Sequence, residues 1–248
     1  MSGSANSVTS YFSLSRAPRY SVLFALPLLI LYEGLAALLA GDDGVILRNG
    51  ADVLLRSLFT SIAGRNGSVI FIALVILLGV WFIARDLKRS RGSLRLSIFC
   101  AMLCESALLA ILFGIIVSKL TTYLLGSMHL LAIGQIENTG WTTRLMLSLG
   151  AGLYEELFFR VLLVSALAAA ARAFLGANGW VAGVLATVVG ALIFALFHYI
   201  GPYGDRFQVQ SFMFRTIGGI AFSALYLLRG FGITAWTHAL YDAFLLLL

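Results

Sequence analysis

Long runs of apolar residues alternate with short polar segments along the chain. A transmembrane helix needs about 20 apolar residues to cross the hydrocarbon core of a bilayer. Measured against this length, the pattern predicts an all-α fold, a polytopic transmembrane helical bundle of about seven spans. The predicted spans cover residues 20–40, 68–85, 96–118, 144–171, 180–200, 208–228 and 231–248.

Two segments between these spans are too polar to cross a membrane. The first, residues 42–67, carries three aspartates and three arginines among its apolar residues. This mixture favours an amphipathic helix that lies at the membrane interface. The second segment, residues 126–143, has a similar character.

The distribution of basic residues predicts the orientation of the chain. The loop at residues 85–95 has five basic residues and only one acid, and the N-terminal segment carries Arg16 and Arg19 without an acid. Short loops rich in lysine and arginine face the cytoplasm. We therefore expect residues 1–19 to form a cytoplasmic N-terminal tail, and residues 20–248 to form a single transmembrane domain whose C-terminus lies outside.

Composition supports a membrane protein and excludes an ordinary soluble domain. Hydrophobic residues make up 60% of the chain and charged residues 11%, and the mean hydropathy is +0.98. The net charge of +6 is explained by the loops and predicts no nucleic-acid partner. Cys100 and Cys104 are one helical turn apart in an apolar run, so we expect buried packing residues and no disulfide.

Glu155 and Glu156 lie together inside the apolar run of the fourth predicted span. A charge at bilayer depth costs a few kcal/mol, and such residues mark functional sites with partners in the bundle. Arg160 follows Glu156 by four residues, on the same helical face, while Glu155 points about 100° away. We therefore expect Glu156 to pair with Arg160, which leaves Glu155 free for chemistry.

Two later spans contribute histidines. His198 ends an apolar helix, and His238 lies four residues before Asp242 on one helical face. Each has a structural alternative, since a lone membrane histidine can simply bond a neighbouring carbonyl. Together with Glu155, however, these groups could polarise a water molecule or hold a zinc ion with one open position.

These residues resemble the motifs of the CPBP family of intramembrane proteases, which includes the CAAX prenyl endopeptidases and abortive-infection-like proteins. The resemblance covers residues 144–248, and the earlier spans match only in hydropathy. Three motifs in the order of the family carry it: Glu155-Glu156-x-x-x-Arg160, Phe194-x-x-x-His198 and His238-x-x-x-Asp242.

The resemblance implies an intramembrane endopeptidase in a multi-pass protein of the bacterial inner membrane. Its substrate would be a membrane-anchored or lipidated protein, cut near the C-terminus. Glu155 and His198 would activate the attacking water, His238 and Asp242 would support the oxyanion, and the pair Glu156 and Arg160 would orient the site. CAAX-processing members end the last motif in Asn, whereas this chain has Asp242.

The sequence leaves the metal and some alternatives open. His198, His238 and Asp242 would suit zinc with Glu155 as base, but the chain has no His-Glu-x-x-His motif, which favours a mechanism without a cofactor. The functional alternatives are a non-enzymatic relative, with a bacteriocin-immunity or scaffold role, and a transporter. We interpret Glu33 and Glu105 as structural acids, paired with Arg215 or Lys119.

Overall fold

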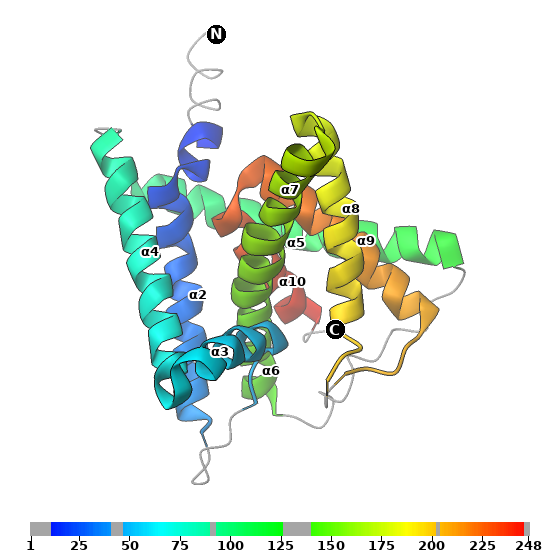
Figure 1. The fold of residues 1–248 in the computed structure, drawn as a ribbon, viewed down its shortest axis with the longest axis horizontal. Helices are drawn as coiled ribbons and strands as arrows, with labels where there is room; N and C mark the ends of the chain where they lie inside the picture. Colours follow the sequence, from blue (N-terminus) through cyan, green and yellow to red (C-terminus); the bar gives the residue numbers. More distant parts are fainter. Residues whose placement is uncertain (1–10, 41–46, 90–92, 126–139, 202–203, 246–248) are drawn as a thin grey trace.

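A computed structural model describes residues 11–40, 47–89, 93–125, 140–201 and 204–245 (Figure 1). Over these ranges the chain is helical and contains no strand, which confirms the predicted all-α fold. The elements are α2 (Pro18–Leu38), α3 (Gly50–Ala63), η1 (Gly64–Asn66), α4 (Gly67–Arg89), α5 (Leu96–Leu125), α6 (Trp141–Gly150), η3 (Ala151–Val164), α7 (Ser165–Leu175), α8 (Gly179–Phe197), α9 (Val209–Arg229) and α10 (Phe231–Leu245).

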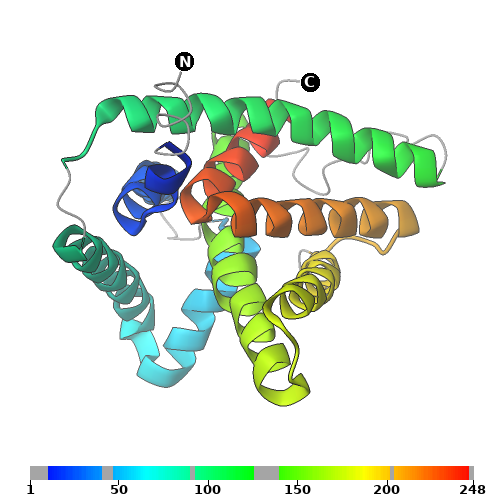
Figure 2. The same cartoon turned by 90° about the horizontal axis from the view of Figure 1, so that it is seen from above.

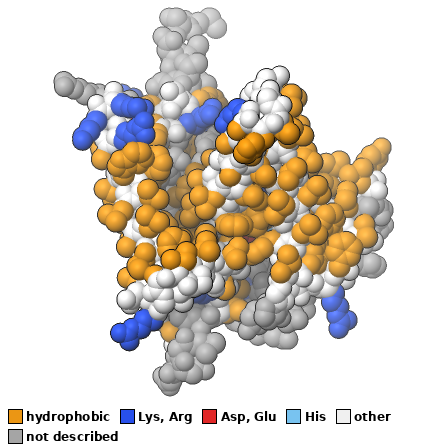
Figure 3. Space-filling view, viewed as in Figure 1, with side chains coloured by type: hydrophobic (Ala, Val, Ile, Leu, Met, Phe, Trp, Pro, Cys, Tyr) orange, Lys and Arg blue, Asp and Glu red, His pale blue; other side chains and the backbone are white. Residues whose placement is uncertain are grey.

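Six helical segments of the described chain are long and apolar enough to cross a membrane, and they account for the first six predicted spans. The seventh, α10, has only 15 described residues, and residues 246–248 of its predicted range lie outside the description. Hydrophobic side chains form a broad band on the face in Figure 3, with lysine and arginine at its two ends. The protein is therefore an integral, multi-pass membrane protein.

The predicted amphipathic helix within residues 42–67 corresponds to α3. Its N-cap is Asn49, whose side chain accepts a hydrogen bond from the backbone N–H of Ala51. The helix lies across the lower ends of α2 and α4 in Figure 1. Residues 41–46 and most of the second polar segment, 126–143, lie outside the described residues.

The continuous helix formed by α6, η3 and α7 runs through the middle of the bundle (Figure 2). α10 packs against η3, α5, α2 and α6, while α8 and α9 pack against each other. Gly152 makes the contact between η3 and α10 possible, because a Cβ atom there would lie 2.3 Å from the carbonyl oxygen of Ala235. This close approach positions the two helices that carry Glu155 and His238.

Glu33 and Glu105 are both paired, but with other residues than predicted. Glu33 contacts Arg48 and Arg56, and Glu105 contacts Arg229 at 2.6 Å. Arg215, one of the expected partners, pairs instead with Asp205. Hydropathy located these acids within helices, but it carries no information about which distant segment supplies the counter-ion.

The prediction that Cys100 and Cys104 are buried is wrong. Both side chains are exposed on α5 and neither forms a disulfide. This helix is apolar on all sides, so its sequence does not distinguish a face that packs on protein from one that faces lipid.

The described parts of the N-terminal tail and of the basic loop lie at the same end of the bundle. Arg19, at the start of α2, is 3.4 Å from Asp86 near the end of α4. Both segments were predicted to face the same side of the membrane, and this contact brings them together. That this side is the cytoplasm stays a prediction.

Candidate active site

The two adjacent glutamates lie in η3, a π-helical segment of 14 residues inside a longer helix. π-helical turns are rare, and they occur frequently at functional sites. Glu155 and Glu156 are both buried, with 8% and 0% of their surface exposed. Two carboxylates removed from solvent require polar partners, and each has a different set.

Glu156 binds two cationic or ionisable groups through the same oxygen. Its Oε1 atom lies 3.0 Å from a guanidinium nitrogen of Arg160 and accepts a hydrogen bond of 2.6 Å from Nδ1 of His238. The predicted pair with Arg160 is therefore confirmed, and the contact with His238 was not predicted. Glu156 thus connects η3 to α10 and sets the orientation of the His238 ring.

Glu155 is held by a residue from the N-terminal half of the chain. The side-chain amide of Asn49 donates a hydrogen bond of 2.8 Å to Oε1 of Glu155. In the sequence, Asn49 is marked only by its position before a helix, where Asn is a common cap. No local pattern could connect two residues separated by 106 positions.

His198 follows the last residue of α8 and is half-buried. Its Nδ1 atom lies 2.9 Å from the carbonyl oxygen of Phe194, which can only accept, so Nδ1 is the protonated donor. In the neutral ring, Nε2 is then an acceptor. The ring of Phe194 lies 4.8 Å from that of His198 and 6.5 Å from that of His238, and His238 contacts Glu156, the neighbour of Glu155, so η3, α8 and α10 bring these groups into one region.

Aromatic rings enclose the His238 side of this region. Phe222 stacks on the imidazole of His238 with ring centres 4.3 Å apart, and Phe194 lies 4.5 Å below the guanidinium of Arg160. Such contacts stabilise cations and fix ring planes. Nε2 of His238 is 3.7 Å from a carboxylate oxygen of Asp242, which is too long for a direct hydrogen bond but within the range of an ion pair when the ring is protonated.

The donor geometry does not fit the zinc ion that the sequence allowed. Among the described residues, no three His, Cys, Asp or Glu side chains lie close enough together to hold a metal ion. Nδ1 of each histidine contacts another group, so a metal ion could bind these rings only through Nε2. Zinc requires ligands at about 2.0–2.2 Å, so His198, His238 and Asp242 would have to move to bind it.

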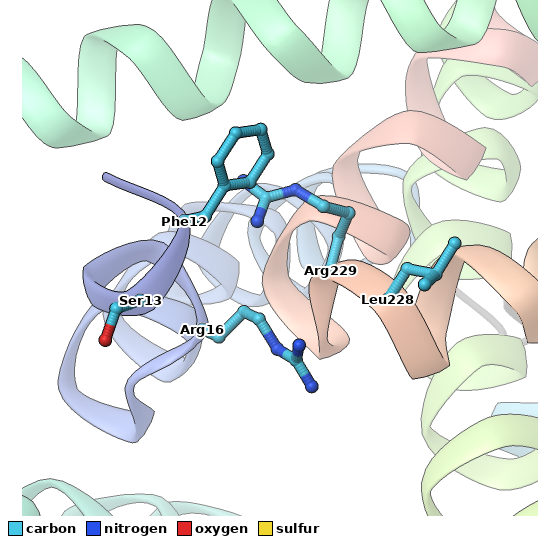
Figure 4. Close-up of a pocket in the computed structure, with 5 residues that line it drawn as sticks. All are labelled: Phe12, Ser13, Arg16, Leu228 and Arg229. Carbon is cyan, nitrogen blue, oxygen red and sulfur yellow. The ribbon is translucent and has the colours of Figure 1, made fainter. Parts of the chain in front are cut away.

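The cavity drawn in Figure 4 is separate from this region. It has a volume of about 450 Å³ and lies between the segment at residues 11–16 and the end of α9. None of the predicted site residues lines it. Its buried cation, Arg229, is neutralised by Glu105, so the cavity does not form part of the candidate site.

Comparison with protein families connects these residues with a known activity. Residues 137–244 match the model of the family described as type II CAAX prenyl endopeptidase Rce1-like. This segment is therefore similar to the Rce1-like endopeptidases. No curated protein and no solved structure matches the chain. The matched segment contains all six predicted site residues, which are Glu155, Glu156, Arg160, His198, His238 and Asp242, and it covers somewhat less than half of the chain.

The match supports a protease of the CAAX type for residues 137–244, within a chain whose described part has six helical segments long and apolar enough to cross a membrane. Asn49 and the helices α2 to α5 precede the matched segment. The partner that fixes Glu155 therefore comes from a part of the chain that the Rce1-like model does not cover.

Proposed function

We propose that the protein is an intramembrane endopeptidase that hydrolyses a peptide bond near the C-terminus of a membrane-anchored or prenylated protein. Glu155 and His198 activate the attacking water, and His238, with Asp242 beside it to orient the ring, supports the oxyanion. The observation that carries the proposal is a buried carboxylate on Glu155 in the region where Phe194 packs against the rings of both His198 and His238, within a segment similar to the Rce1-like endopeptidases.

The hydrogen bonds around Glu155 and His198 leave one acceptor atom free on each side chain. Oε1 of Glu155 accepts from Asn49, so Oε2 is available to the water. Nε2 of His198 is available because Nδ1 donates to Phe194. Water bound between these two acceptors can lose a proton to Glu155 as its oxygen bonds to the scissile carbonyl carbon.

The same proton completes the reaction. Glu155 returns it to the leaving amine nitrogen as the C–N bond breaks, which gives a carboxylic acid and a free amine and restores the carboxylate of Glu155. A buried, enclosed site favours this transfer because bulk water does not compete for the proton.

His238 is placed to stabilise the negative oxygen of the tetrahedral intermediate. Its Nδ1 donates to Glu156, and a protonated ring would carry an N–H at Nε2, on the side of Asp242. That N–H can donate to the oxyanion. Glu156 and Arg160 hold the ring in place, and no metal ion takes part in the proposed mechanism.

The proposal is tested by comparing C-terminal peptides of membrane proteins from cells with the wild-type protein and with Glu155→Ala. We expect a small set of membrane proteins to keep a longer C-terminus in the variant, at unchanged abundance of the variant protein. Unchanged termini with a lost phenotype would favour an immunity or scaffold role. A change in solute flux without a change in termini would favour a transporter.

A further inference from the structure

We propose that Asn49 is a positioning residue for Glu155, so that the point where Tyr32 of α2 contacts Asn49 at the start of α3, called the corner below, forms part of the active site. The inference rests on the proposed function and extends it to a segment that precedes the matched protease domain. It also predicts that the C-terminal segment with its six site residues is incomplete without this corner.

The orientation of the Asn49 amide is fixed by two hydrogen bonds. Its Oδ1 atom accepts from the backbone N–H of Ala51 at 2.9 Å, so the NH₂ group must face Glu155. That group donates to Oε1 of Glu155 at 2.8 Å. Rotation of the amide by half a turn would break both bonds, which makes this the one satisfied arrangement.

The backbone of Asn49 is held by a second set of contacts. Its N–H donates to the hydroxyl of Tyr32 at 3.1 Å, and this hydroxyl donates to Asp52 at 2.9 Å. Asp52 is fully buried and pairs with Arg48 and Arg56. Asn49 is therefore anchored to both α2 and α3, and it presents a donor in a defined position.

The protease domain leaves space for this corner. A Cβ atom at Gly150 would lie 2.5 Å from the ring of Tyr32 and 2.9 Å from the Cβ of Asn49. Only glycine allows the corner to approach the helix this closely, five residues before Glu155. Gly150 on one side therefore fits Tyr32 and Asn49 on the other, which indicates a specific packing contact.

This geometry has a direct consequence for catalysis. A hydrogen bond from a neutral donor to a carboxylate favours the ionised form and restricts its rotation. Asn49 therefore keeps Oε1 occupied and directs Oε2 toward the water. Without the amide, Glu155 would still be present, but it would populate orientations that do not contact the water.

Asn49→Ser separates positioning from helix capping. Serine caps helices about as well as asparagine, but it is too short to reach Glu155. The matched control is Asn178→Ser, because Asn178 caps α8 through Trp180 and Val181 and contacts no site residue. We expect Asn49→Ser to lower kcat about tenfold or more with little change in KM, and Asn178→Ser to leave both unchanged.

Thermal melts of Asn49→Ser, Glu155→Ala and the double variant test the contact independently of activity. We expect the changes in Tm to be non-additive, because both substitutions remove the same hydrogen bond. Additive changes in Tm, or an unchanged kcat in Asn49→Ser, would overturn the inference. A wild-type protein that cleaves no substrate would overturn the proposed function, while the melting cycle would still decide whether Asn49 holds Glu155.

Discussion

The adjacent glutamates differ in what each would lose on substitution. Glu156 neutralises the guanidinium of Arg160, a residue that is 1% exposed. The nitrogen atoms of this guanidinium have no hydrogen-bond acceptor among the described residues. Glu155 instead accepts from a neutral amide and faces two imidazoles. One residue therefore balances a buried cation, and the other retains an oxygen for chemistry.

Glu155→Gln should abolish turnover and leave Tm almost unchanged, because Gln keeps the shape and an acceptor for Asn49. Glu156→Gln should instead lower the free energy of unfolding by about 3–5 kcal/mol, since it leaves Arg160 buried and unpaired. Thermal melts in detergent beside a peptide-cleavage assay measure both effects. Equal losses of activity and stability in the two variants would remove the distinction between the glutamates.

Asp242→Asn tests the proposal that no metal takes part. The amide can donate a hydrogen bond to the oxyanion and a carboxylate cannot, so we expect activity to be kept or raised. In a zinc enzyme the same change would remove a charged ligand and cost about tenfold or more. Near-stoichiometric zinc in the purified protein, together with an inactive Asp242→Asn variant, would contradict the metal-free mechanism.

At the residue scale, the sequence predicts contacts that follow from helical spacing and misses those that cross the bundle. The pair Glu156 and Arg160 follows from a separation of four residues. The contacts of Glu156 with His238 and of Glu155 with Asn49 span 82 and 106 positions, and no periodicity encodes them. These two contacts form only because η3 packs against α10 and α3.

At the scale of elements, the contact between η3 and α10 determines where His238 lies. Gly152 approaches Ala235 and Ala239, which flank His238 on α10. Any side chain at position 152 must push α10 away from η3. Because Glu156 holds His238 across this contact, the position of the helix and the geometry of the site are linked.

Gly152→Ala should therefore lower the free energy of unfolding by about 1–3 kcal/mol and reduce the cleavage rate. The matched control is Gly183→Ala in α8, where a Cβ atom would meet nothing within 4 Å. That control should keep activity and gain up to about 1 kcal/mol from helix propensity. Equal Tm values and equal cleavage rates for the two variants would show that the close contact between η3 and α10 is unimportant.

Hydropathy predicted most of the elements because the bilayer sets a length that each span must satisfy. The π-helical character of η3 could not be predicted, since an apolar run that contains two acids is equally compatible with an α-helix. The prediction of an amphipathic helix within residues 42–67 located α3. It did not indicate that the N-cap of this helix faces the active site.

For the whole molecule, the basic residues at one end of α4 predict the orientation in the membrane. Lys88 and Arg65 are both exposed and lie near opposite ends of this helix. In a background with Cys100→Ala and Cys104→Ala, we expect Lys88→Cys to react with an impermeant maleimide only from the cytoplasmic side. Arg65→Cys should react only from outside, and the reverse result would invert the predicted topology.

The whole-molecule arrangement also assigns a role to the N-terminal half. The sequence resemblance begins only at the fourth span, yet α2 and α3 supply the network that fixes Glu155. The proposed catalytic site is therefore built from the N-terminal and C-terminal parts of the chain. Glu155, the proposed base, lies where these two parts contact each other.

The most direct test of this account is cleavage of a prenylated C-terminal peptide by the purified protein, compared with the Glu155→Gln variant. We expect the wild-type protein to release the C-terminal fragment, and the variant to melt at the same temperature without releasing it. A folded Glu155→Gln protein that cleaves the peptide at the wild-type rate would contradict the assignment of Glu155 as the base.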